Sequence, residues 1–257
     1  MPFRASIWLV TMVVAFAWAG RTMAQTVVLS QGGEVPRGLA FASDLKAVEP
    51  SEPLDTSATR LAIVIDVPDD TGNLEAFVKA GGRLLVLGDA VRQLPASLTG
   101  AELGPAGEKQ RDRLSGGGYG KGEPIVLRAM DRTHAISRDL RGRLVVSGPL
   151  SPVLSYEAER NQTLVSVDSM ATAHKQPTHT PVLWLSPLEA GVVACLSLQT
   201  WDAAEARPMV EATIKGLRLD EVKVEANPKV HARESSLAKQ QLGEQIIPKR
   251  ENDQSDG

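Results

Sequence analysis

The chain has 257 residues, of which 42% are hydrophobic and 23% are charged, a composition typical of a globular protein with a substantial core. Its 28 basic and 31 acidic residues give a net charge of -3, which argues against nucleic acid or an anionic membrane surface as a partner. Aromatic residues make up 4% of the chain, too few for a base-stacking surface, and the single cysteine, Cys195, excludes an intrachain disulfide and a multi-cysteine zinc site.

The first 24 residues are typical of a secretory signal peptide. A basic residue precedes an apolar run over residues 7–19, and Thr22 and Ala24 place small residues at the −3 and −1 positions of a cleavage site. At ~1.5 Å per residue this run spans about 20 Å, less than the roughly 30 Å hydrocarbon core of a membrane. We expect residues 1–24 to be removed and the mature protein, beginning at Gln25, to be periplasmic or extracellular without further membrane contact. The alternative is an uncleaved signal anchor that tethers the protein to a membrane.

A helix, a glycine turn and a buried strand are predicted in immediate succession over residues 74–89. Three apolar side chains lie at i, i+3 and i+4 and so share one helical face: Leu74, Phe77 and Val78. Gly81 lies where a left-handed residue ends a helix without a steric penalty. Residues 84–87 form a continuous apolar run, which is typical of a central parallel strand.

A second buried strand is predicted over residues 61–67. Its distance from residues 84–87 suits a right-handed crossover through the intervening helix, so the two strands are expected to be parallel neighbours. Residues 26–29 are a candidate first strand, and residues 30–59 are predicted to be mostly irregular. The pattern predicts an α/β protein, a flavodoxin-like three-layer sandwich with a mainly parallel central sheet.

The rest of the chain predicts a loop, short strands, a helix and a tail. Clustered glycines over residues 95–122 favour an exposed, mobile loop, and the spacing does not fit a phosphate-binding loop. Residues 222–257 are polar and charged with few large apolar side chains, so we expect a disordered tail after a domain at residues 25–221. The other elements are predicted as strands over residues 125–127, 144–146 and 163–167, a hairpin over 180–185 and 191–198 with a turn at 186–190, and a helix over 204–217.

Three segments taken together resemble the ThuA-like proteins, named for trehalose utilisation, of the class I glutamine amidotransferase-like superfamily. They are the helix-glycine-strand unit at residues 74–89, the segment 131–136, which is similar to a D-x-x-H-P-I motif, and residues 180–184 before the final strand and helix. The resemblance covers residues 61–219. It implies an amidotransferase-like domain and a carbohydrate-like ligand, although Ala135 replaces the usual proline and Gly88-Asp89 replaces a frequent histidine.

The residues themselves do not predict a catalytic centre, a metal site or a cofactor. An amidotransferase nucleophile needs a glycine-flanked elbow and a histidine partner, whereas Cys195 lies in an apolar run and is expected to be buried and inert. No G-x-S-x-G motif occurs in the chain. The closest histidine pair, His174 and His179, is separated by Pro177, which prevents the two from sharing one helical face.

A ligand site is predicted at the carboxyl ends of the strands. Asp89 follows the strand at residues 84–87, and Asp131 and His134 follow the strand at residues 125–127, so these three side chains are candidate ligand-binding residues. The alternative is a structural one, a capping arrangement in which Asp131 or Thr133 accepts backbone N–H bonds of the following turn. The sequence thus predicts a non-catalytic protein that binds a small, carbohydrate-like ligand or a partner. A ThuA-like carbohydrate-processing enzyme is the alternative, and the oligomeric state is not predicted.

Overall fold

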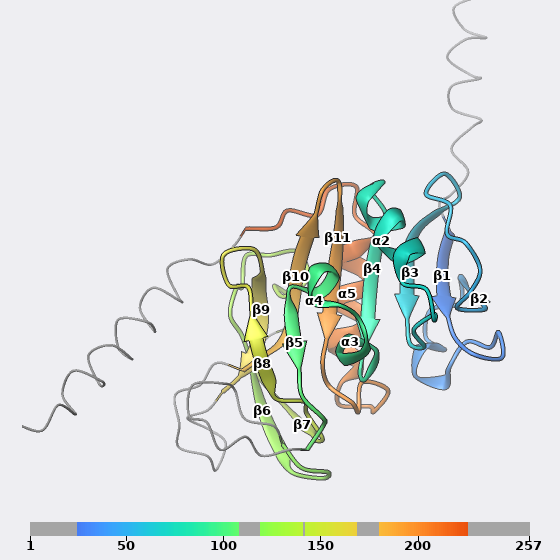
Figure 1. Ribbon diagram of the computed structural model, residues 1–257. Helices are drawn as coiled ribbons and strands as arrows, with labels where there is room; N and C mark the ends of the chain where they lie inside the picture. Colours follow the sequence, from blue (N-terminus) through green and yellow to red (C-terminus); the bar gives the residue numbers. More distant parts are fainter. Residues whose placement is uncertain (1–24, 108–118, 141, 169–179, 226–257) are drawn as a thin grey trace, which may run out of the picture.

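The computed structural model describes residues 25–107, 119–140, 142–168 and 180–225 (Figure 1). The predicted signal peptide, His174 and His179 lie outside these residues. Within them, no helix has the length and apolar character needed to cross a membrane.

A large twisted sheet organises the described part of the chain. It is parallel from β2 to β11 and antiparallel from β11 to β7, so the parallel strands form one half of the sheet. The predicted parallel pairing of β3 with β4 is confirmed. In spatial order the strands are β2 (Leu45–Val48), β1 (Gln25–Leu29), β3 (Thr59–Val64), β4 (Arg83–Leu87), β11 (Gly191–Leu196), β10 (Pro181–Leu188), β9 (Gln162–Val167), β6 (Pro124–Ala129) and β7 (Arg143–Ser147).

Both faces of this sheet are covered. In Figure 1, α2 (Gly72–Lys79), α3 (Ala90–Gln93) and α4 (Ala96–Thr99) lie in front of the sheet, and α5 (Arg207–Leu217) lies behind it. A small sheet of β5 (Ala101–Leu103) and β8 (Val153–Tyr156) lies on the same side as α2. The α/β fold around a large sheet is therefore confirmed.

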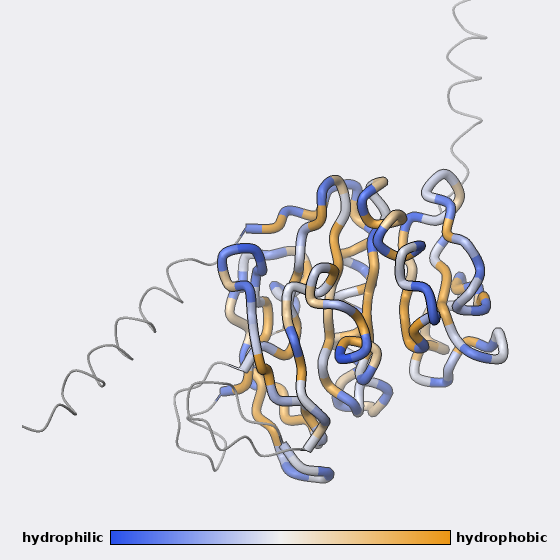
Figure 2. The backbone as a smooth tube through the Cα atoms, viewed as in Figure 1, coloured by the Kyte–Doolittle hydropathy of each residue, from blue (hydrophilic) through white to orange (hydrophobic). Residues whose placement is uncertain are grey.

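The strand β4 shows how the two cores arise from the alternation of side chains along a strand. Leu84 and Val86 belong to the apolar cluster that contains the buried residues of α2, whereas Leu85 and Leu87 belong to the cluster that contains those of α5. All four side chains are fully buried. In Figure 2 the hydrophobic segments of the backbone tube are concentrated in the central strands.

The turn between α2 and β4 follows the prediction from its two glycines. Gly81 has a φ of +97°, and its N–H donates to the Val78 carbonyl at 2.9 Å. The N–H of Gly82 donates to the Phe77 carbonyl, also at 2.9 Å. These two bonds close the helix end. A Cβ atom on Gly82 would lie 2.4 Å from the buried Phe77 ring, so the turn also depends on a close approach between ring and backbone.

Two predicted irregular regions contain regular structure. Residues 30–59 include β2 and the short 3-10 helix η1 (Arg37–Leu39). Residues 95–107 contain α4 and β5, and Leu98 and Leu103 in them are buried, so the prediction of an exposed loop is wrong for this part. These elements have three or four residues each, too few to show a hydrophobic period. Their apolar side chains pack against distant parts of the chain. Residues 108–118 of the predicted loop lie outside the described residues.

The hairpin of β10 and β11 is tighter than predicted. Leu188 pairs with Gly191, which leaves Glu189 and Ala190 as the turn, and Glu189 has a φ of 51°. Pro187 lies inside β10 although proline cannot donate to a strand ladder. It is tolerated because β9 pairs with β10 only as far as Leu185, so Pro187 has no strand neighbour on that side.

Candidate functional site

Asp131 shapes the turn that follows β6. Its Oδ1 atom accepts hydrogen bonds from the Thr133 N–H at 2.8 Å, the Thr133 hydroxyl at 2.7 Å and the His134 N–H at 3.1 Å. Burial raises the pKa of Asp131, but the hydrogen bonds from Thr133 and His134 outweigh it, so the pKa lies below its ordinary value. The structural alternative for Asp131, acceptance of backbone N–H bonds of the turn, is confirmed.

His134 is held at both ring nitrogens by backbone groups. Nε2 lies 2.8 Å from the Lys223 carbonyl oxygen, which can only accept, so Nε2 carries the proton. Nδ1 accepts the Ile136 N–H at 3.2 Å, so it carries a lone pair. The two partners together assign the neutral Nε2–H tautomer.

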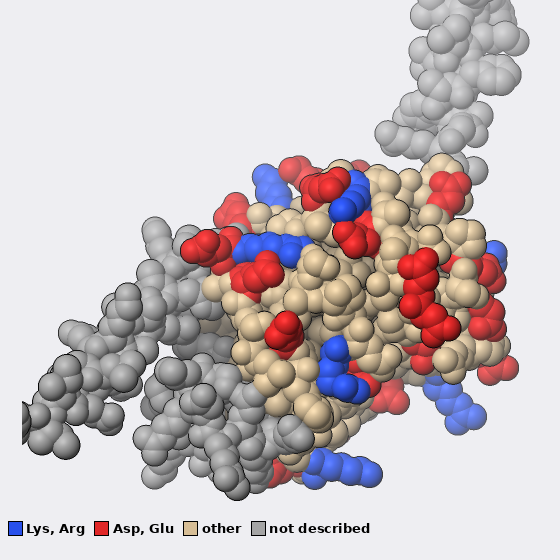
Figure 3. Space-filling model, in the orientation of Figure 1, with Lys and Arg blue, Asp and Glu red and all other residues tan. Residues whose placement is uncertain are grey.

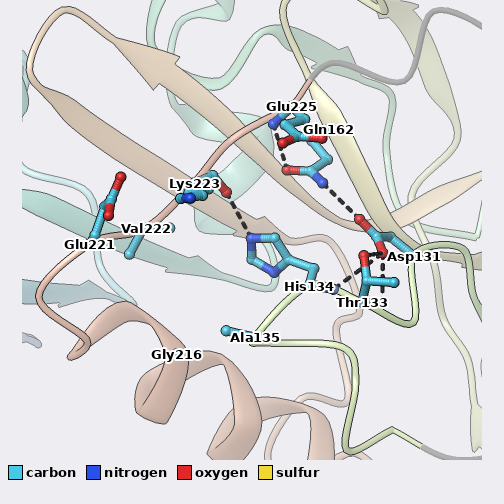
Figure 4. A pocket seen from close by; sticks show the side chains of 10 residues that line it. All are labelled: Asp131, Thr133, His134, Ala135, Gln162, Gly216, Glu221, Val222, Lys223 and Glu225. Carbon is cyan, nitrogen blue, oxygen red and sulfur yellow. Dashed lines mark hydrogen bonds between the residues drawn. The ribbon is translucent and has the colours of Figure 1, made fainter.

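Gln162, the first residue of β9, connects the turn to the carboxyl-terminal segment (Figure 4). Its Nε2 atom donates to Asp131 Oδ2 at 3.0 Å, and its Oε1 atom accepts the Glu225 N–H at 2.9 Å. The side chain is buried. Sequence reasoning missed Gln162, because a single glutamine at the start of a strand has no distinguishing pattern.

These residues line a cavity of about 270 Å³ that is closed on one side by residues 221–225. Figure 4 shows the turn after β6 facing this segment across the cavity, with α5 below. The polar groups at its walls are carboxylates, an amide, a hydroxyl, an imidazole and an ammonium group. The lining residues are Asp131, Thr133, His134, Ala135, Gln162, Gly216, Glu221, Val222, Lys223 and Glu225.

The carboxyl-terminal wall differs from the prediction of a disordered tail from residue 222. Val222 and Val224 are half-buried against the core, and the residues on either side of them are exposed. The alternation of charged and valine residues over 221–225 is the period-two signal of an extended segment with one buried face. This signal was available in the sequence but was hidden by the polar composition of the residues that follow. Those residues, 226–257, lie outside the described part of the chain.

Asp89 does not join Asp131 and His134. Since β10 runs antiparallel to both β9 and β11, β9 is parallel to β11 and β4, and β6 is antiparallel to them. The carboxyl ends of β4 and β6 therefore lie at opposite edges of the sheet. The five residues of β4 alone span about 17 Å at ~3.3 Å per residue. The predicted grouping of the three side chains is wrong because it assumed that both strands run in the same direction.

The Asp89 carboxylate is occupied by its own helix. Arg92 of α3 donates from Nε at 2.9 Å and from Nη2 at 3.0 Å, and Gln93 donates at 2.8 Å. The hydrogen bond from Arg92 lowers the pKa of Asp89, with burial acting in the opposite sense and Gln93 adding to the lowering. This arrangement stabilises the first turn of α3 and directs no free carboxylate oxygen toward Asp131 or His134.

Charge and cysteine chemistry give little sign of a reactive centre. Figure 3 shows side chains of both signs on the face that carries α2 to α4, with acidic residues gathered toward the β1 side. Cys195 is fully buried, and burial raises the pKa of its thiol. Within the described ranges, no three His, Cys, Asp or Glu side chains converge as metal ligands.

Comparison with known proteins identifies the fold. No protein-family model matches the sequence, and no curated protein matches it. A ThuA-like protein of Bacteroides uniformis ATCC 8492 superposes with a TM-score of 0.55 and 10% identity, over 75% of this chain and 90% of that chain.

Two further solved structures match at similar levels. A ThuA-like protein of Parabacteroides merdae ATCC 43184 gives a TM-score of 0.51 and 12% identity, over 78% of this chain and 91% of that chain. A β-galactosidase of Bacillus circulans sp. alkalophilus gives 0.51 and 13%, over 76% of this chain and 30% of that chain. The two ThuA-like structures match over most of their own length, so the predicted resemblance is confirmed for the architecture. This chain has a ThuA-like fold.

Proposed function

We propose that this chain is an exported, non-catalytic binding protein built on a degenerate amidotransferase-like domain of the flavodoxin-like, three-layer type. The observation that supports it is that the polar side chains around the cavity bind backbone groups of the protein itself. Asp131, His134 and Gln162 each hold the backbone of the turn or of residues 221–225. In this arrangement they position protein segments.

Catalysis by these residues would need one of them to be released. A general base must present a lone pair to the proton that it removes, and the Nδ1 lone pair of His134 already accepts the Ile136 N–H. A nucleophile is also required for acyl transfer, and the buried thiol of Cys195 has no such access. Binding without chemistry therefore fits the geometry better than turnover does.

The cavity suits a small, hydroxylated ligand. Its volume of about 270 Å³ is just below the range of about 300–1,000 Å³ that is usual for ligand pockets, so it limits the ligand to a small one. Carboxylate, amide and hydroxyl groups line it, and such groups both donate to and accept from sugar hydroxyls. We therefore propose a carbohydrate-like ligand, with Asp131 and His134 in the site and without Asp89.

The test is a thermal-shift screen of the mature protein against sugars, sugar acids and divalent metal ions. A ligand present at 100 times its dissociation constant should add about 2.7 kcal/mol to the free energy of unfolding. Glu221→Gln and Lys223→Ala change lining side chains but keep the backbone contacts of the segment, so we expect them to reduce the shift. Asp89→Ala, at the other edge of the sheet, is the matched control and should keep it.

Two results would overturn the proposal. A shift that is lost in Asp89→Ala and kept in both lining variants would place the ligand at the carboxyl edge of β4. Release of product from a glycoside by the wild-type protein would favour the alternative, a ThuA-like carbohydrate-processing enzyme.

Export is the remaining part of the proposal. N-terminal sequencing of the protein from a periplasmic or culture fraction should find a mature chain that begins near Gln25. An intact Met1 in the membrane fraction would instead establish a signal anchor.

A further inference from the structure

The segment over residues 221–225 is bound as an extended peptide. Its residues alternate between exposed and half-buried, and the two half-buried side chains, Val222 and Val224, pack on the cluster that includes α5. The three charged residues point away from that cluster. The domain therefore recognises one apolar face of the segment, as a sheet recognises the inward face of a strand.

The backbone of the segment is recognised by side chains that take the place of a neighbouring strand. In an extended chain, the C=O of one residue and the N–H of the second residue after it point to the same side. In a parallel sheet these two groups bind the N–H and the C=O of a single residue on the next strand. Here His134 donates to the Lys223 carbonyl, and Gln162 accepts the Glu225 N–H. The two side chains supply that donor and acceptor pair.

Residues 217–220, the root, lead into the segment and are held by more hydrogen bonds than residues 221–225, the tip. At the root, the Arg83 guanidinium donates to the carbonyls of Leu217, Leu219 and Asp220, and Arg60 donates to Leu219 and Asp220. At the tip, two hydrogen bonds and two half-buried valines hold residues 221–225. The tip can therefore leave its site while the root stays in place.

We propose that His134 and Gln162 form a peptide-backbone clamp, and that the clamp binds the same five-residue segment of a second copy of this chain when its own tip is displaced. The second copy is the occupant because its segment has the sequence whose fit is seen in the structure. Exchange of an identical element between copies needs no new complementary surface. This inference does not depend on a small ligand in the cavity.

The test measures binding of a synthetic fluorescent peptide, residues 220–226, to the full mature chain by fluorescence anisotropy. The wild-type protein should bind weakly, because its own tip competes for the clamp. The variant Val222→Asp/Val224→Asp releases the tip and should bind at least about tenfold more tightly. Glu225→Pro, which removes the N–H that Gln162 accepts, should act in the same direction and serves as an independent second variant.

Modified peptides test backbone recognition directly. Methylation of the peptide nitrogen at the position of Glu225 should abolish binding, whereas methylation at the position of Val224, whose N–H points the other way, should not. Gln162→Leu in the tip-released variant should also abolish binding. Equal binding of both methylated peptides, or no gain in either tip-released variant while the melting curve stays cooperative, would overturn the clamp.

The identity of the occupant is tested by sedimentation of the mature protein. Wild-type protein should self-associate at high concentration, and Val222→Asp/Val224→Asp, whose tips no longer fit the clamp, should remain monomeric. Peptide binding without self-association at ten times the peptide dissociation constant would overturn the second copy as the occupant.

Discussion

Contacts between residues close in the sequence stabilise the unit from α2 to β4, whereas contacts between distant residues join the walls of the cavity at the end of β6. In the unit, residues 72–87 form a helix, a turn and a strand that contact one another within the same stretch of chain. At the cavity, the bonds that connect its walls run from Gln162 to Asp131, from His134 to Lys223 and from Glu225 to Gln162, and they join residues 31, 89 and 63 positions apart in the sequence. Local patterns determine the first region, and the path of the whole sheet determines the second.

A sequence motif predicts which helix, strand or turn carries a side chain. It does not predict which other motif lies beside that side chain in the fold. Asp89 and Asp131 both follow a strand, as expected from the sequence. They lie at opposite edges of the sheet because the strand order places β6 antiparallel to β4. Strand direction is decided by how many crossovers and hairpins the chain makes between them, and this count is not visible in either motif.

The largest effect is expected from Phe77→Ala, which tests the locally determined region. Phe77 of α2 is buried with its ring against Gly82, so truncation should reduce the free energy of unfolding by about 3–5 kcal/mol. Chemical denaturation measures this loss. The control is Leu154→Ala on β8, where the side chain is 50% exposed and the loss should stay within about 0.5 kcal/mol. Equal losses in the two variants would show that α2 is not packed as described.

An intermediate effect is expected from shortening the chain at the cavity. A protein that ends at Glu225 keeps the bound segment, whereas one that ends at Glu221 loses its two hydrogen bonds and both half-buried valines. We expect a difference of about 1–3 kcal/mol between them, since a net hydrogen bond contributes about 0.5–1.5 kcal/mol. Identical melting curves for the two proteins would contradict the docking of residues 222–225.

The acid dependence of stability tests the hydrogen bonds of Asp131. The pKa of Asp131 is lower in the folded protein than in the unfolded chain, so its contribution is present above about pH 4 and is lost as pH falls further. Asp131→Asn should therefore differ most from wild type at neutral pH and least below about pH 3. Thr133→Val, which removes one donor and keeps the carboxylate, should lie between them. A difference that is constant from pH 3 to pH 8 would contradict this role.

The smallest effect is expected at the other edge of the sheet. Asp89→Ala removes a bidentate ion pair with Arg92, but the carboxylate side chain is 41% exposed. Exposed pairs contribute about 0–1 kcal/mol, so the loss should stay below about 1 kcal/mol. Arg92→Ala should give a similar value in the same denaturation experiment. A loss of more than about 2 kcal/mol would indicate that this edge carries a buried network instead.

Most of the large sheet could be predicted from the sequence because its strands are long apolar runs. β3, β4, β6, β9 and the hairpin of β10 and β11 follow the predicted order, with ends that differ by a few residues. The small sheet could not be predicted, since β5 and β8 are short and Leu154 on β8 points outward. Their pairing depends on a contact between segments about fifty residues apart, which periodicity does not report.

The candidate site could be predicted in part. Asp131 and His134 were identified from the turn motif, and they do lie together at the cavity. Gln162 and residues 221–225 were missed because the bonds between them involve backbone groups. Every residue has such groups, so the binding partner cannot be recognised from its residue type. Only the alternation of Val222 and Val224 with charged residues gave a usable signal.

The root of the carboxyl-terminal segment also fixes where the two ends of the domain leave it. Arg218, just after α5, donates to the hydroxyl of Thr26 at 3.2 Å, so the first strand begins beside the exit of the last helix. Beyond Arg218 the chain crosses the sheet from β1 to β9, where Gln162 binds Glu225, so the described domain begins and ends on opposite sides of the sheet (Figure 1). A circularly permuted chain would therefore need a linker that spans the five strand spacings from β1 to β9, roughly 24 Å at ~4.8 Å each, with new termini opened at the loop after β3.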